Sequence, residues 1–238
     1  MSRLQEFSDH RKIQGKTTVR LKTKNKYTVF FDFDKTITSI DVIDNMLPIF
    51  SKDKHWVSLE DKWVKGKIGS KICLDGQIRG IRASDVEIDK YLSGIQLDPY
   101  FKKTVSLLDS LGIKYMILSD DFDYIISKIL ANHGIKNVKF RANHLSLSHN
   151  RLNPSFPFIN KNCDICAHCK TKNLLANATK NSIIIYIGDG QSDACPAGYA
   201  DLVFAKEPLL RHCKQEKITC VPFKALKDVY GYLKRSLE

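Results

Sequence analysis

Short apolar runs alternate with longer segments of helical spacing along most of this chain. Three of the runs, 27–31, 113–119 and 183–188, have the length and the aliphatic and aromatic content of strands that are buried on both faces. Between the second and third runs, the spacing predicts a helix over 124–133 that Gly134 ends. This alternation of strands and helices predicts an α/β domain built on a mostly parallel sheet.

The segments between these strands suggest a small inserted domain. Residues 41–93 show helical patterning without a strong strand, and we expect a small helical cap inserted after the first strand. Residues 143–161 are rich in turn formers and are expected to form a loop, whereas 203–205 is expected to be the final short strand. The predicted division is a basic N-terminal extension over 1–26, a catalytic core over 27–40 and 94–238, and a cap over 41–93.

Acidic and hydroxyl side chains stand where the apolar runs end. The first run is followed by Asp32 and Asp34, the second ends in Ser119, and the third leads to Asp189. Open α/β sheets bind their ligands at the carboxyl ends of their strands, so we expect these groups to meet there. Because alternate residues of an extended chain point to opposite faces, the chain must bend after Asp32 for both acids to serve one site.

The chemistry of this set suits attack on a phosphate. One carboxylate can act as the nucleophile and a second can carry the proton, while hydroxyl groups and Lys170 can hold the anion. The complete pattern resembles the four motifs of phosphatases of the haloacid-dehalogenase (HAD) superfamily. Those motifs are Asp32-x-Asp34-x-Thr36, Ser119, Lys170, and Gly188-Asp189-Gly190-Gln191-Ser192-Asp193.

This resemblance covers residues 27–238 and implies a Rossmann-like core, a helical cap and an aspartyl-phosphate mechanism. It implies that Asp32 is the nucleophile and Asp34 the general acid and base. Mg²⁺ is the implied cofactor, since it prefers an all-oxygen site. Its implied ligands are the Asp32 and Asp189 carboxylates and the Asp34 carbonyl, with Asp193 beside the metal. Thr36, Ser119 and Lys170 are the implied phosphate-binding residues.

Local sequence features indicate which families within the superfamily the chain resembles most. Three cysteines precede Lys170 in the order Cys163-x-x-Cys166-x-x-Cys169, and a Cys-Pro pair follows the fourth motif. Both resemble phosphoethanolamine/phosphocholine phosphatases and their relatives that hydrolyse pyridoxal phosphate. The cysteines before Lys170 and the segment Ala200-Asp201-Leu202-Val203-Phe204-Ala205 also resemble the related methionine-salvage phosphatase, which acts on a diketo-methylthiopentane phosphate. The chain departs from both groups at Asp120-Asp121-Phe122, where neither pattern is present.

Asp120 is the residue on which our preference for one class of substrate rests. A carboxylate beside a phosphate is costly unless a cation lies against it, and ethanolamine or choline supplies one. We therefore expect Asp120 to face the ammonium group of such a substrate; the alternative is a loop acid that faces solvent. The diketo-methylthiopentane phosphate, pyridoxal phosphate and phosphoserine remain alternative substrates.

Charge and cysteine content add expectations about location and partners. The formal net charge is +12, and residues 1–26 carry eight Lys or Arg against two acids. That basic arm suggests nucleic-acid or membrane-surface binding as a non-enzymatic alternative, but no aromatic residues are interleaved as a stacking platform requires, so a solvated extension is favoured. The odd number of cysteines, seven, and the lack of an apolar run of about 18 residues predict a cytoplasmic protein.

The cysteines before Lys170 allow two interpretations. With His168, the thiols of Cys163, Cys166 and Cys169 could nearly fill a tetrahedral zinc site. The spacing is compact and no second cysteine pair follows nearby, so a loop that positions Lys170 fits at least as well. Oligomeric state is not predicted.

Overall fold

A computed structural model describes residues 21–22, 25–161, 163 and 165–237, so the predicted N-terminal extension lies almost wholly outside the described residues. Its centre is a seven-stranded sheet in the order β4-β3-β2-β1-β5-β6-β7. Every neighbouring pair is parallel except β3 and β4. The strands are β1 (Tyr27–Phe31), β2 (Lys114–Phe122), β3 (Phe140–Ser148), β4 (Arg151–Ser155), β5 (Ile183–Gly188), β6 (Leu202–Ala205) and β7 (Cys220–Pro222). The predicted α/β class is confirmed.

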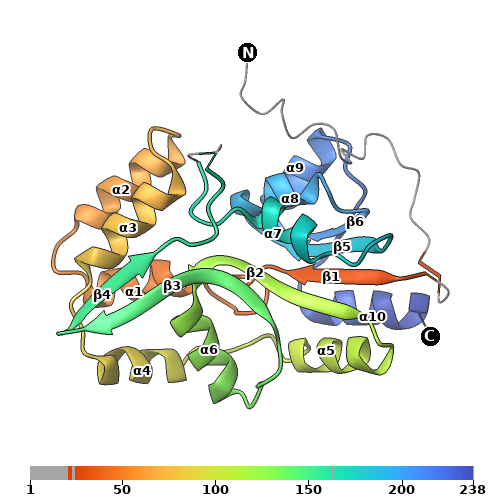
Figure 1. Cartoon of the computed structure of the whole chain (residues 1–238), viewed down its shortest axis with the longest axis horizontal. Helices are drawn as coiled ribbons and strands as arrows, with labels where there is room; N and C mark the ends of the chain where they lie inside the picture. Colours follow the sequence, from red (N-terminus) through yellow and green to blue (C-terminus); the bar gives the residue numbers. More distant parts are fainter. Residues whose placement is uncertain (1–20, 23–24, 162, 164, 238) are drawn as a thin grey trace.

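Helices cover both faces of the sheet (Figure 1). One face carries α5 (Phe101–Ser110), α6 (Asp123–Asn132) and α10 (Leu226–Leu237), and the other carries α7 (Lys170–Asn177), α8 (Ala194–Ala197) and α9 (Leu209–Gln215). All five residues of β1 are buried, as the unbroken apolar run predicts for a central strand between β2 and β5. The carboxyl ends of these three strands therefore meet at one edge.

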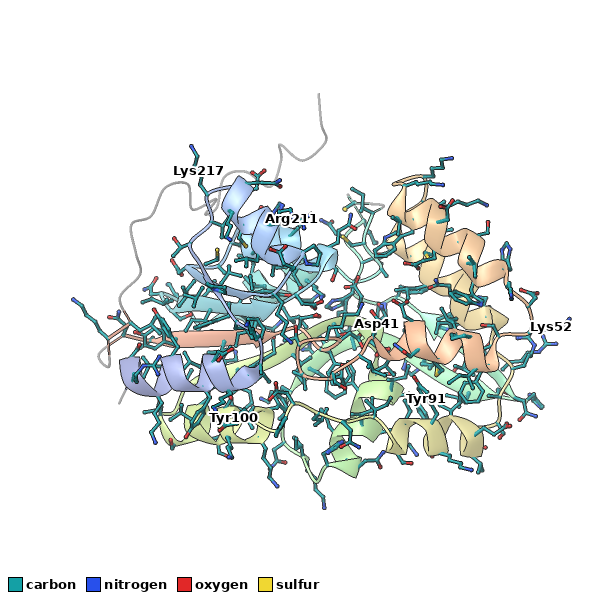
Figure 2. The ribbon with its side chains drawn as sticks, turned by 180° about the vertical axis from the view of Figure 1, so that it is seen from behind. Asp41, Lys52, Tyr91, Tyr100, Arg211 and Lys217 are labelled. Atoms are coloured by element: carbon teal, nitrogen blue, oxygen red, sulfur yellow. The ribbon has the colours of Figure 1, made fainter. Side chains whose placement is uncertain are left out.

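Four helices occupy the predicted cap region: α1 (Val42–Phe50), α2 (His55–Val64), α3 (Ser70–Gly80) and α4 (Asp85–Ser93). Local signals explain two of the helix starts. The Asp41 side chain accepts from the Asp44 N–H at the start of α1, and Ser84 and Glu87 form a capping box on α4. Tyr91 of α4 lies near Asp41 in Figure 2, and its hydroxyl donates to the Val42 carbonyl oxygen (3.3 Å).

The predicted loop over 143–161 is wrong as far as Ser155. Strand β3 continues to Ser148 and turns back as β4, with Ser148 paired to Arg151. His149 and Asn150 form the turn at φ of 51° and 56°, the left-handed pair that a two-residue hairpin needs. Turn formers inside a hairpin thus resemble a loop in sequence. The hairpin reaches beyond the sheet and packs its outer strand against α3.

Two strand predictions also need correction. Strand β2 runs three residues past Ser119 to Phe122, through a register irregularity against β3. Strand β7 follows the strand that was expected to be the last; its three residues are too short to give an apolar pattern.

The described helices include none with both the length and the apolar character that crossing a membrane requires. The division into core and cap stays a proposal, because the β3–β4 hairpin of the core range packs on cap helix α3.

Candidate active site

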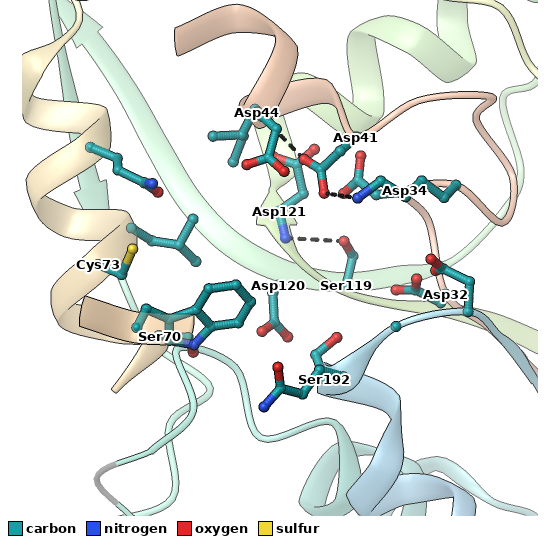
Figure 3. Close-up of a pocket in the computed structure, with 18 of the residues that line it drawn as sticks. Asp32, Asp34, Asp41, Asp44, Ser70, Cys73, Ser119, Asp120, Asp121 and Ser192 are labelled. Atoms are coloured by element: carbon teal, nitrogen blue, oxygen red, sulfur yellow. Dashed lines mark hydrogen bonds and ion pairs between the residues drawn. The ribbon is translucent and has the colours of Figure 1, made fainter. Parts of the chain in front are cut away.

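A cavity of about 250 Å³ lies at the carboxyl ends of β1, β2 and β5, beneath the cap helices. Six predicted site residues line it: Asp32, Asp34, Ser119, Asp120, Lys170 and Asp189. The topology explains the gathering, because β1 lies between β2 and β5 and places three strand ends together. Figure 3 shows Asp32 and Asp34 on one side of this cavity and Cys73 of α3 on the opposite side.

Lys170 is the centre of a buried charge network. Its side chain is only 2% exposed, and its Nζ donates to Asp32 Oδ1 (2.5 Å), Asp193 Oδ1 (2.7 Å) and Ser192 Oγ (2.9 Å). Burial alone would lower the pKa of Lys170, but the Asp193 and Asp32 carboxylates outweigh it and raise that pKa well above its usual range. The site therefore holds a permanent cation against the predicted nucleophile.

Asp193 organises the loop after β5. It is fully buried, and its Oδ2 accepts from the N–H groups of Asp189 and Gly190, each at 3.0 Å. Its Oδ1 accepts from the Tyr186 hydroxyl (2.6 Å) as well as from Lys170. Gly188 is required by this packing, because a Cβ there would lie 2.8 Å from the Asp193 carboxylate carbon. Asp193 thus fixes both the loop and the lysine.

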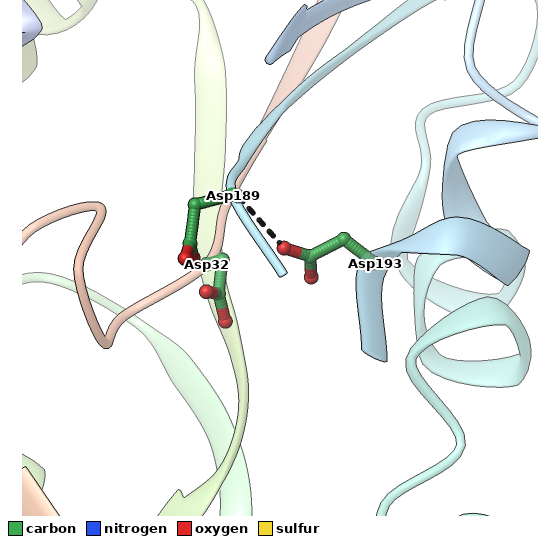
Figure 4. Close-up of side chains that lie close together, drawn as sticks. All are labelled: Asp32, Asp189 and Asp193. Carbon is green, nitrogen blue, oxygen red and sulfur yellow. Dashed lines mark hydrogen bonds between the residues drawn. The ribbon is translucent and has the colours of Figure 1, made fainter. Parts of the chain in front are cut away.

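The acids around Asp32 fit a divalent cation. Ligand oxygens of Asp32, Asp189 and Asp193 all lie within 4.8 Å of one another (Figure 4). Burial, and then the Asp193 carboxylate, raise the pKa of Asp32, so the ionised nucleophile needs positive charge nearby. Since Asp193 already accepts from Lys170, Tyr186 and two backbone N–H groups, Asp32 and Asp189 are the carboxylates left to hold a metal.

Asp34, the predicted general acid and base, is held by a backbone hydrogen bond from the cap region. Its Oδ1 accepts from the Val42 N–H (2.9 Å) at the start of cap helix α1. Burial, and then the Asp121 and Asp41 carboxylates, raise the pKa of Asp34 well above its usual value. A carboxyl group with a raised pKa would suit the general-acid role predicted for Asp34.

Thr36 is the predicted phosphate-binding residue that does not line the cavity. It is fully buried, and its hydroxyl donates to Asp189 Oδ1 (3.3 Å). This bond orients Asp189, one of the two carboxylates available to a metal. A direct role of Thr36 in phosphate binding stays a prediction.

The cavity also has an acidic wall that sequence reasoning found only in part. Besides Asp120, it contains Asp41, Asp44, Glu60 and Asp121. Asp121 is only 2% exposed, and one oxygen of each of Asp120 and Asp121 is buried without a hydrogen-bond partner among the described residues. Burial raises the pKa of Asp120 to about 6. Two adjacent acids directly after Ser119, which ends the second apolar run of the sequence, were the available signal for Asp121.

The cysteines before Lys170 give no support to the zinc alternative. Among the described residues, Cys163, Cys166, Cys169 and His168 form no group of three metal-ligating atoms within 4.8 Å. His168 is buried, packs edge-on against Phe158 with ring centroids 5.5 Å apart, and leaves both ring nitrogens without a partner among those residues. The segment is a packed loop that leads into Lys170.

The fold and site define a phosphatase of the HAD type, a phosphoric monoester hydrolase, and comparisons with known proteins agree. The chain belongs to the family named Putative Phosphatase, whose model matches residues 27–212. It is similar to 2-hydroxy-3-keto-5-methylthiopentenyl-1-phosphate phosphatases, with 27% identity to that of Exiguobacterium sp. over 87% of this chain and 96% of the relative. The corresponding enzyme of Geobacillus thermodenitrificans is 26% identical, over 89% and 97%.

Solved structures show the same fold. A HAD family hydrolase from Salmonella enterica serovar Typhi superimposes with a TM-score of 0.69 at 19% identity, over 92% of this chain and 72% of the other. A substrate-bound phosphoserine phosphatase gives a TM-score of 0.65 at 18% identity, over 88% and 99%. The predicted superfamily and enzyme class are confirmed.

Proposed function

We propose that this protein is a Mg²⁺-dependent phosphatase that hydrolyses a small phosphomonoester through an aspartyl-phosphate on Asp32. The observation that carries the proposal is the contact of Lys170 Nζ with Asp32 Oδ1 (2.5 Å) in a cavity that Asp34 also lines. Asp32, Asp189 and the Asp34 carbonyl would hold Mg²⁺, which supplies charge stabilisation for the phosphoryl oxygens when bound.

The reaction has two steps, and Asp34 acts as an acid in the first and as a base in the second. An Asp32 carboxylate oxygen attacks phosphorus and forms a new P–O bond as the ester P–O bond breaks, while Asp34 gives its proton to the departing alkoxide. Asp34 then takes a proton from a water molecule that attacks phosphorus, and the bond to Asp32 breaks to release inorganic phosphate. Lys170 and Ser119 hold the phosphoryl oxygens in both steps.

The acidic wall supports an ammonium-bearing substrate such as phosphoethanolamine or phosphocholine. The described residues that line the cavity include two cations, Lys35 and Lys170, and both are paired with carboxylates: Lys35 with Asp41 (3.1 Å) and Lys170 with Asp32. The buried, unpartnered oxygens of Asp120 and Asp121 would gain a partner from a protonated or quaternary amine. Phosphoserine suits the wall less well, because its carboxylate would add another negative charge.

The methionine-salvage substrate is the second candidate. The curated relatives carry that activity in their names. On this chain, Ile43, Trp63 and Leu74 of the cap line the cavity and offer an apolar surface that a methylthio group would fit.

A phosphate-release screen with Mg²⁺ tests the proposal. The substrates are phosphoethanolamine, phosphocholine, the diketo-methylthiopentane phosphate, pyridoxal phosphate and phosphoserine, with Asp32→Asn as the blank. The ammonium assignment is supported if the wild type releases phosphate from the amine esters and Asp120→Asn lowers this activity at least tenfold. Activity on an ester with a neutral leaving group should stay unchanged in the same variant. Release from the diketo or pyridoxal ester alone would keep the mechanism and reject that assignment.

Location and partners complete the proposal. We infer a cytoplasmic enzyme, because the chain has seven cysteines, an odd number that does not suit a framework of paired disulfides. Binding of RNA or anionic vesicles would instead support the basic arm as a docking segment, provided that deletion of residues 1–26 abolishes it.

A further inference from the structure

The cap is joined to the segment before Lys170 by a pair of short hydrogen bonds from one residue. Ser70, the first residue of α3, donates its N–H to the Ile165 carbonyl oxygen (2.7 Å). Its hydroxyl accepts from the Ala167 N–H, also at 2.7 Å, across 97 positions of sequence. Ser70 is only 8% exposed and lines the same cavity as Lys170.

The segment that Ser70 holds is short and packed. Two residues, His168 and Cys169, separate Ala167 from Lys170, and all four are buried. The Cys169 N–H donates to the Phe158 carbonyl oxygen (3.0 Å), and the Lys170 N–H to that of His168 (2.9 Å). Because the residues from Ala167 to Lys170 are all buried, we expect a shift of Ala167 to pass to the Lys170 backbone.

Lys170 is sensitive to such a shift because its ammonium group is fixed by three partners, Asp32, Ser192 and Asp193. We propose that Ser70 is a positioning residue that links the seating of the cap to the placement of Lys170. This inference rests on the proposed role of Lys170 at the phosphoryl group. When α3 is seated, the Ser70 hydroxyl holds Ala167, and the Lys170 ammonium stands against Asp32.

The test compares Ser70→Ala with Ser70→Thr, which keeps the hydroxyl, and with Ser84→Ala. Ser84 is a cap serine that caps α4 and does not line the cavity, so its variant is the matched control. Ser70→Ala leaves the buried Ala167 N–H unpaired and should lower kcat/KM about tenfold. The loss should be equal for small and bulky esters, since Lys170 contacts the phosphoryl group that all of them share.

Two readouts separate positioning from simple structural support. Inhibition by inorganic phosphate should weaken about fivefold in Ser70→Ala, and hydrogen exchange of amides 165–170 should accelerate. Ser70→Thr should restore the phosphate inhibition and the slow amide exchange of the wild type. Ser84→Ala should change neither quantity. Full activity in Ser70→Ala, or a loss confined to bulky esters, would overturn the inference; the second result would make Ser70 a substrate contact.

The outcome remains distinct from failure of the proposed function. If the wild type releases no phosphate from any ester, the proposed function fails. The Ser70 inference is then decided by calorimetric binding of inorganic phosphate with Mg²⁺, using Lys170→Ala as the reference, and by the same amide exchange. Unchanged phosphate affinity and unchanged exchange in Ser70→Ala would reject it.

Discussion

At the scale of single residues, the site consists of buried carboxylates with different partners. Asp193 is fully satisfied by Lys170, Tyr186 and backbone N–H groups, so it supports the loop after β5. Asp34 accepts one backbone hydrogen bond and keeps a raised pKa. Asp120 has a buried oxygen without a partner among the described residues. Their surroundings, and not their residue type, separate the supporting acid from the two acids for which we propose roles in proton transfer and substrate binding.

The role of Asp34 predicts a divided effect of Asp34→Asn. Turnover of an alkyl phosphate should fall by about 10²–10⁴, because its leaving group needs a proton. p-Nitrophenyl phosphate, whose leaving group needs none, should still give one rapid equivalent of phenolate before slow hydrolysis of the aspartyl-phosphate. Stopped-flow absorbance measures this burst, and Asp32→Asn is the control that should show none. Undiminished steady-state turnover of both esters would remove Asp34 from the mechanism.

Asp120 predicts a pH-dependent gain of stability in Asp120→Asn. Its folded-state pKa of about 6 lies above the unfolded value, so the folded protein binds this proton more tightly. The contribution of the carboxyl group is therefore most favourable at low pH and is lost as pH rises towards 6. Asp120→Asn should raise the free energy of unfolding at pH 7.5 by up to about 3 kcal/mol, and by less than about 1 kcal/mol near pH 4.

Urea unfolding at the two pH values checks this expectation, with the exposed Glu216→Gln as the control. An equal change in the free energy of unfolding at both pH values would show that burial does not raise the pKa of Asp120.

At the scale of elements, local patterns predicted the buried strands but not the hairpin. Strands β1 and β5 are continuous apolar runs because helices cover both faces of the sheet, so their sequences identify them. The outer part of β3 alternates exposed and buried residues and contains turn formers, and its partner β4 holds Pro154. Ser70 was not predictable, since its contact with Ala167 depends on how the cap is seated.

The hairpin turn predicts opposite effects of two substitutions. Asn150 has a φ of 56°, which glycine adopts freely and a β-branched residue adopts at a cost. Asn150→Gly should leave the free energy of unfolding unchanged or slightly raised, whereas Asn150→Val should lower it by about 1–2 kcal/mol. Chemical denaturation measures both. Ser146→Val, on the exposed side of β3, is the control that should not destabilise; a harmless Asn150→Val would argue against this turn.

At the scale of the whole molecule, the charge at the strand ends should couple metal binding to stability. Mg²⁺ that binds only the folded protein should raise the free energy of unfolding, by about 2.7 kcal/mol at a concentration one hundred times its Kd. Removal with a chelator should reverse the gain. NaCl at equal ionic strength should not reproduce it, and Asp189→Asn should lose it. Thermal melts measure the effect; equal stabilisation of Asp189→Asn would place the ion elsewhere.

The strand order has a consequence for the synthesis of the chain. Strand β1 emerges early, yet one of its two neighbours in the sheet is β5, which begins at Ile183. At typical elongation rates the ribosome needs on the order of 10–30 s to make the intervening segment. During that time the fully buried strand β1 has one edge unpaired, and helix α3 lacks its partner β4 until the hairpin has been made. We therefore expect the unpaired edge of β1 to make the nascent chain prone to aggregation until β5 has been translated.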